Sequence, residues 1–104
     1  LHMQKPAKML VRQVATVSDW PGARIRLNEE EYKVHAAHAQ EDFSKGEVGE
    51  VLRADKKGIA IQTGDGVFVI DVLQPPNKKA MSVAAFLNGH SVEPGTKVTP
   101  WETQ

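Results

Sequence analysis

The run from Gly66 to Leu73 constrains the fold of this chain more than any other segment. Its residues are apolar at both alternating positions, so a strand built from it is buried on both faces. Such a strand is typical of a barrel that also carries a helix on its outside. The preceding Asp65-Gly66 is a strong hairpin signal, and we expect a type I′ turn there, with positive φ at both central residues.

Shorter runs with strand alternation lie on either side of this segment. Ile25 and Leu27 alternate with Arg24 and Arg26, which places the two arginines together on the opposite face. The same pattern places Tyr32, Val34 and Ala36 inward, with Lys33 and His35 facing the other way. We therefore expect strands over residues 23–27, 32–36, 48–54, 58–63, 66–73 and 96–98.

Two segments have helical spacing. Leu10, Val14 and Val17 form one apolar stripe, which predicts a helix from Ala7 to Val17. Ser82 is typical of an N-cap and starts a second, shorter helix whose buried stripe is Val83, Phe86 and Leu87, with Gly89 as its left-handed stop.

Together these elements predict a mainly β protein. We expect a small Greek-key barrel, open and similar to the oligonucleotide-binding (OB) fold, with an N-terminal helix and a short capping helix. An SH3-like barrel is the nearest alternative. The 104 residues predict a single domain, 1–104, and Leu1-His2-Met3 is expected to be a cloning remnant.

Composition excludes several classes of function. Without cysteine, the chain has no disulfides and no thiolate metal sites. No apolar run approaches the ~20 residues that span a bilayer, so we expect a cytoplasmic protein with no membrane partner. The 13 basic and 13 acidic side chains give a formal charge of zero, which argues against strong autonomous binding of RNA but leaves room for a local basic face.

Paired lysines follow a stiff turn. Lys78 and Lys79 come after Pro75-Pro76-Asn77, and two prolines reduce the entropy that the loop loses when a ligand binds. A phosphate contact is one interpretation of the lysine pair, and an ordinary solvated turn is the other. Arg24 and Arg26 have the same two interpretations, a basic stripe along an RNA backbone or a solvated face.

Other candidate sites are weaker. His35 and His38 are three residues apart, which on a strand means opposite faces and argues against a shared metal ion. No serine lies in a Gly-x-Ser-x-Gly elbow, so nucleophilic catalysis is not expected. Trp20 is interpreted as an anchor of its Pro-Gly turn, with base stacking as the alternative.

Four motifs in order resemble the C-terminal domain of methionyl-tRNA formyltransferase, over roughly residues 10–98. They are Trp20-Pro21-Gly22-Ala23, Gly49-Glu50-Val51, the hairpin from Gly58 to Gly66, and the final run with Leu73, Gln74, Lys78, Lys79, Met81, Phe86, Leu87 and Gly89. This sequence departs from the family at Asn77, where the family has glycine. Asparagine also accepts the left-handed conformation that a glycine would supply.

The resemblance implies a function that the residue patterns alone do not. The family's C-terminal domain helps to hold initiator Met-tRNA, and its catalytic residues and 10-formyltetrahydrofolate lie in an N-terminal formyltransferase domain. We therefore expect an inactive tRNA-binding fragment or separately expressed domain, with no cofactor of its own. The alternative is a packing domain of a small-molecule or sugar-nucleotide formyltransferase without an RNA role. The expected phosphate contacts are Arg12, Arg24, Arg26, Lys33, Lys78 and Lys79.

Overall fold

A computed structural model of the chain describes residues 6–16, 24–27, 30–41 and 46–100. Within these residues the chain forms two helices and a seven-stranded antiparallel sheet. The elements are α1 (Ala7–Thr16), β1 (Arg24–Leu27), β2 (Glu30–Gln40), β3 (Val51–Asp55), β4 (Gly58–Gln62), β5 (Val67–Gln74), β6 (Met81–Ser82), α2 (Val83–Phe86) and β7 (Val98–Pro100).

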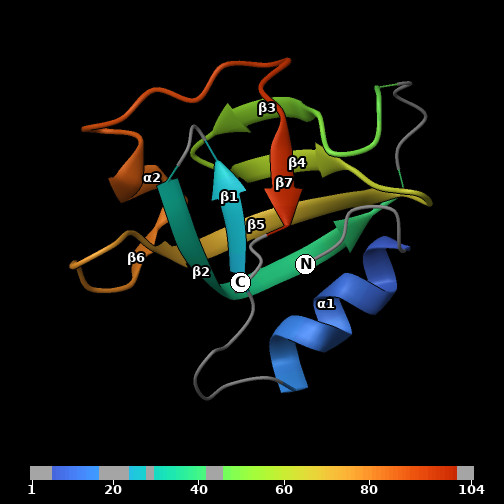
Figure 1. The fold of residues 1–104 in the computed structure, drawn as a ribbon, viewed down its shortest axis with the longest axis horizontal. Helices are drawn as coiled ribbons and strands as arrows, with labels where there is room; N and C mark the ends of the chain where they lie inside the picture. Colours follow the sequence, from blue (N-terminus) through green and yellow to red (C-terminus); the bar gives the residue numbers. More distant parts are fainter. Residues whose placement is uncertain (1–5, 17–23, 28–29, 42–45, 101–104) are drawn as a thin grey trace.

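The sheet is curled, with the strand order β3-β4-β5-β2-β1-β7 and β6 paired to β5 (Figure 1). β2 is long and bends, so its start pairs with β1 while the rest pairs with β5. The two ends of this order also meet, because Val51 N donates to Thr96 O (2.8 Å) and Val98 N donates to Gly49 O (2.7 Å). The predicted class, a mainly β open barrel with an N-terminal helix and a short capping helix, is confirmed, and the sheet takes the form of a curled antiparallel half-barrel.

β5 is buried on both faces, as its sequence predicts. Phe68 and Ile70 join the main core, whereas Val67 and Val69 form a second cluster with Ala60 on the opposite face. The position of the helix differs from the expectation of a helix outside the barrel. Buried residues of α1, Ala7, Leu10 and Val14, belong to the same cluster as Phe68 and Ile70. The helix therefore completes the main core, and Figure 1 shows it alongside the far half of β2.

Two local predictions are wrong in detail. The hairpin before β5 is present, but among its described residues only Gly66 has positive φ (+85°), so the turn is not type I′. α2 ends at Phe86 with Leu87 as a right-handed C-cap, and Gly89 does not have the predicted left-handed conformation. The structure also contains a short strand that was not expected, β6, in which Met81 pairs with Leu73 of β5.

An irregularity in β2 inverts its later alternation. The pairing with β5 shifts register between Val34 and Ala36 and again between Ala36 and Ala37. A bulge of this kind adds a residue to one strand, and Ala37 and Ala39 then pack against the core in place of Ala36. The expected bounds of α1, β1, β4 and β5 agree with the structure to within one residue, whereas β2 extends beyond the expected 32–36, and β3 and β7 are shifted from 48–54 and 96–98. The predictions for Val17, Trp20 and the turn at Trp20 lie outside the described residues.

Candidate nucleic-acid interface

Three polar side chains form a row across neighbouring strands. Arg24 of β1 is the cross-strand partner of Lys33 of β2, and Lys33 is in turn the partner of Gln74 of β5. Side chains directly opposite each other on antiparallel strands lie on one face with their Cβ atoms about 4.5–5.5 Å apart. The fold thus brings together residues that are far apart in the sequence.

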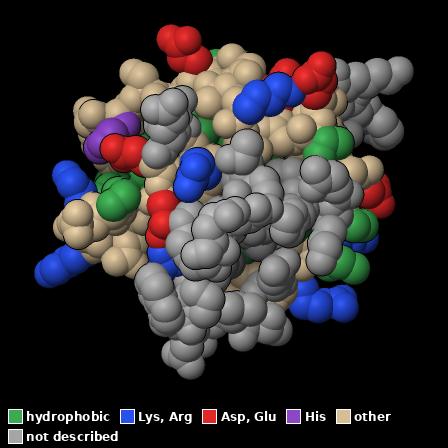
Figure 2. Space-filling model, viewed as in Figure 1, with side chains coloured by type: hydrophobic (Ala, Val, Ile, Leu, Met, Phe, Trp, Pro, Cys, Tyr) green, Lys and Arg blue, Asp and Glu red, His purple; other side chains and the backbone are tan. Residues whose placement is uncertain are grey.

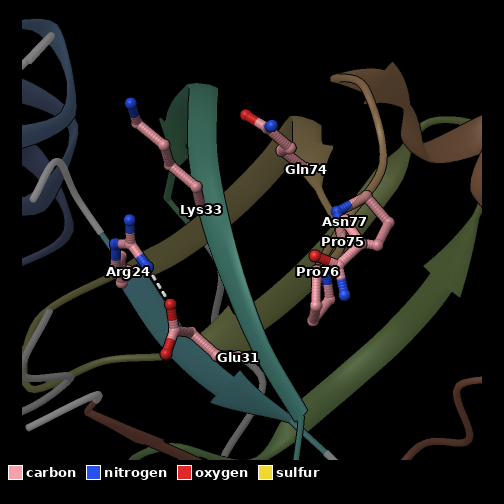
Figure 3. Close-up of a pocket in the computed structure, with 7 residues that line it drawn as sticks. All are labelled: Arg24, Glu31, Lys33, Gln74, Pro75, Pro76 and Asn77. Carbon is pink, nitrogen blue, oxygen red and sulfur yellow. Dashed lines mark hydrogen bonds and ion pairs between the residues drawn. The ribbon is translucent and has the colours of Figure 1, made fainter. Parts of the chain in front are cut away.

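This row forms one wall of a pocket of about 380 Å³, and the loop after β5 forms the other wall (Figure 3). The lining residues are Arg24, Glu31, Lys33, Gln74, Pro75, Pro76 and Asn77. Pockets of roughly 300–1,000 Å³ accommodate small molecules, and this one is large enough for part of a nucleotide.

The loop that forms the second wall has a defined backbone. Asn77 has φ +61°, the left-handed conformation for which asparagine was expected to substitute for glycine, so that prediction is confirmed. Lys78 N donates to Pro75 O (3.3 Å), and the Gln74 amide Nε2 donates to Lys78 O (2.9 Å). Lys78 and Lys79 directly follow this turn and are exposed, although neither is among the residues that line the pocket.

An acidic residue modifies the charge of the site. The guanidinium Nη1 of Arg24 pairs with the Glu31 carboxylate, and the Arg24 side chain is only 10% exposed. Glu31 is also the cross-strand partner of Arg26, which is exposed. The arginine pair predicted for one face is therefore present, but Glu31 partly neutralises it.

The remaining predicted residue lies on a different element. Arg12 is exposed on α1 and is not among the residues that line the pocket. On the face shown in Figure 2, the described basic and acidic side chains are interspersed rather than gathered by sign. Sequence reasoning did not predict that the remaining lining residues share one cavity with Arg24 and Lys33. These residues are Glu31, Gln74, Pro75, Pro76 and Asn77. The strand residues among them are brought together by the pairing register of β1, β2 and β5, and the sequence of a single strand does not reveal that register.

The two histidines of β2 correct a further prediction. The irregularity between them places both on the outer face, where His35 Nε2 contacts Gln74 Oε1 (2.8 Å) and His38 Nδ1 contacts Asp71 Oδ2 (2.8 Å). They do not lie on opposite faces as expected. Within the part of the chain that the structure describes, no group of three or more histidines and carboxylates is arranged to hold a metal ion.

Comparison with known proteins identifies the family. The model of the formyl transferase C-terminal domain matches residues 1–91. The chain belongs to this family. Among similar proteins, the methionyl-tRNA formyltransferase of Myxococcus xanthus is 38% identical over 97 residues, and that of Moorella thermoacetica is 30% identical over 95 residues.

The match covers most of this chain but a small part of its relatives. These alignments span 93% and 91% of the chain and 30% of each relative, so the chain corresponds to about a third of their length. Among solved structures, HypX from Aquifex aeolicus in complex with tetrahydrofolic acid aligns with a TM-score of 0.69 at 22% identity, over 92% of this chain and 20% of that one. At that identity the likeness shows the shared fold of this formyltransferase domain.

The length and hydrophobicity of the described helices bear on whether the chain could cross a membrane. Of the described helices, neither α1 (Ala7–Thr16) nor α2 (Val83–Phe86) is long and apolar enough to cross a lipid bilayer. The cytoplasmic location remains a prediction.

Proposed function

We propose that this chain is the C-terminal domain of a methionyl-tRNA formyltransferase and supplies a surface that binds and orients initiator Met-tRNA. The family match and the shared name of the relatives support the first part of the proposal, the identity of the domain. Formyl transfer itself would take place in an N-terminal catalytic domain outside residues 1–104. That domain would bind 10-formyltetrahydrofolate, as the family resemblance implies.

The row of Arg24, Lys33 and Gln74 beside the lysine-bearing loop is the observation that carries the proposal. Phosphates of a nucleic acid are recognised by cations and amide donors, and both kinds of group line this pocket. The turn at Asn77 is held by two hydrogen bonds, so little conformational entropy is lost when Lys78 or Lys79 contacts a phosphate.

Two further cations extend the surface in this proposal. Arg26 lies on the same face of β1 as Arg24, and Arg12 projects from α1. Each would contact a phosphate of the same tRNA farther from the pocket. The resulting binding is expected to be weak and strongly dependent on salt, because it depends on a few phosphate contacts in a chain with no net charge.

A double substitution at the lysine pair tests this assignment. Lys78→Ala/Lys79→Ala is expected to weaken tRNA binding and to reduce the slope of log affinity against log salt by roughly 0.7–0.9 per lost contact. Lys56→Ala/Lys57→Ala is the matched control, since it removes an exposed lysine pair from the turn between β3 and β4. An equal change in both variants, or an unchanged slope in the first, contradicts the assignment.

A second candidate is a packing domain, without an RNA role, in a formyltransferase that acts on a small molecule or a sugar nucleotide. The zero net charge, the Arg24–Glu31 pair and the interspersed charges on the face shown in Figure 2 favour it. The HypX likeness agrees with it, because HypX was solved with tetrahydrofolic acid. Absence of tRNA binding to the 104-residue chain at low salt would favour this candidate over the first.

A further inference from the structure

A second pocket, of about 230 Å³, lies between the start of β2 and the segment that follows α2. Its lining residues are Glu30, Tyr32, Phe86, His90, Ser91 and Val92. Glu30 and Tyr32 alternate along β2 with Glu31 and Lys33, which line the first pocket. Because successive side chains of a strand point to opposite faces, the two pockets are separate sites on the two sides of β2.

Three rings in contact build the second pocket. Tyr32 meets Phe86 edge to face, with the ring centroids 5.5 Å apart and the planes at 80°. His90 stacks on Phe86 with centroids 4.5 Å apart and planes only 6° from parallel. Tyr32 and Phe86 are buried, whereas His90 is exposed, so the stack is fixed on the core and ends in an imidazole that a ligand can reach.

The charge of this pocket is opposite to that of the first. Glu30 is its carboxylate, and no lysine or arginine is among the described residues that line it. The Tyr32 hydroxyl donates towards Glu30 Oε2 (3.4 Å), and burial, followed by the nearby Glu30 charge, raises the pKa of Tyr32. The phenol therefore stays protonated and remains a donor, and the site presents one negative charge beside a flat ring stack. A phosphate would be repelled and a cation attracted.

We propose that this pocket binds a planar guanidinium group, as carried by an arginine side chain. The carboxylate of Glu30 can accept paired hydrogen bonds from a guanidinium, and the exposed face of His90 offers a ring on which the planar cation can stack. An alkylammonium lacks the planar shape and makes only the charge contact. The proposal concerns a different face and an opposite charge from the tRNA surface, and does not depend on it.

A titration followed by NMR of backbone amides tests the proposal on the 104-residue chain. N-acetyl-arginine amide is expected to give saturable shifts confined to residues around 30–32 and 86–92. N-acetyl-citrulline amide has nearly the same shape without the charge, and is expected to give none. Equal shifts with both compounds, or no saturable shift with arginine, overturn the proposal.

Two further compounds are tested. The first distinguishes a small-molecule from a polypeptide source of the guanidinium, and the second tests a nucleobase as a competing ligand. n-Butylguanidine carries a guanidinium with the same single charge and no peptide groups, so equal binding indicates a small-molecule source and tighter binding of N-acetyl-arginine amide indicates a polypeptide. Adenosine tests whether the ring stack instead receives a nucleobase, which stacking alone would allow. Shifts at these residues with adenosine but not with arginine would overturn the cation assignment.

Matched variants locate the binding group. Glu30→Gln is expected to weaken arginine binding by about tenfold or more, because it removes the charged acceptor of the hydrogen bonds. Glu93→Gln makes the same change at an exposed glutamate that does not line the pocket, and is expected to bind like the parent chain. His90→Ala should also weaken binding, through loss of stacking, while a preserved amide spectrum elsewhere reports an intact fold. Unchanged affinity in Glu30→Gln contradicts the proposal.

Discussion

Arg24 of β1 lies directly opposite Lys33 of β2, so two cations share one face of the sheet at paired positions. Like charges placed opposite each other on antiparallel strands are destabilising, and the ion pair between Arg24 and Glu31 offsets this repulsion. The arrangement concentrates positive charge while keeping the folded sheet stable. It also means that Glu31 competes with any phosphate for Arg24.

Removing that competing carboxylate is expected to strengthen tRNA binding. In Glu31→Gln the Glu31 carboxylate no longer competes with phosphate for the Arg24 guanidinium, so affinity rises at low salt and the log-log salt slope steepens by up to about 0.9. Filter binding at several salt concentrations measures both quantities. Glu93→Gln, which changes the net charge equally away from the pocket, serves as the control. A similar gain in both variants indicates a general charge effect and contradicts the specific one.

Two glycines with opposite surroundings give a matched pair for stability. A Cβ on Gly58, which has φ +132°, would lie 2.6 Å from Val69 Cγ1 and 2.7 Å from Ile70 O. Gly58→Ala is therefore expected to lower the free energy of unfolding by roughly 2–4 kcal/mol. Gly89 has no atom within 4 Å of a built Cβ and no positive φ, so Gly89→Ala is expected to stabilise by about 0.4–1 kcal/mol. Urea denaturation of both variants checks the contrast, and equal effects contradict it.

The buried hydroxyl of Thr63 holds the turn before β5. Its Oγ1 lies within 2.9 Å of Asp65 O and 2.8 Å of Gly66 O, and it accepts a hydrogen bond from Asp65 N (3.1 Å). Thr63→Val keeps the shape but removes the buried hydroxyl and its hydrogen bonds to this turn, so we expect a loss of about 0.5–1.5 kcal/mol. Thr63→Ser retains the hydroxyl and is expected to lose less. Thermal denaturation that ranks serine below valine would refute this role.

Stability at high pH is expected to depend on Tyr32. Burial and then the Glu30 charge raise the pKa of this phenol above its ordinary value of 10.0, so the folded chain holds the proton more tightly than the unfolded chain does. The resulting contribution is complete below the unfolded pKa and is lost as the pH rises through the folded pKa. The stability advantage of the parent chain over Tyr32→Phe should therefore shrink above about pH 10. Chemical denaturation across this range tests it, and parallel stability curves for the two chains contradict it.

The local pattern of apolar residues predicted most of the helices and strands, but not the irregularity within β2. The alternation of Ile25 with Leu27 and the stripe of Leu10 with Val14 placed those residues in the core correctly, because burial dominates where a segment has one apolar face. The same reasoning failed at Ala36, where a register shift in the pairing with β5 inverted the pattern. A bulge depends on the partner strand, so one strand's sequence does not reveal it.

The candidate site was likewise only partly predictable from the sequence. Asn77 and the lysine pair were evident from the chain, since a left-handed position and exposed cations depend on local chemistry. The neutralising contact of Glu31 with Arg24 was not evident, although both residues were in view.

The sequence by itself determined most of the strand and helix segments, most of the exposed cations and, through its motifs, the formyltransferase family. Tertiary structure alone decided that Lys33 and Gln74 face one pocket while Glu30, Tyr32 and His90 face another. The physical reason is that side-chain periodicity is a local property, whereas cross-strand register and the packing of α2 against the barrel depend on residues far apart in the chain.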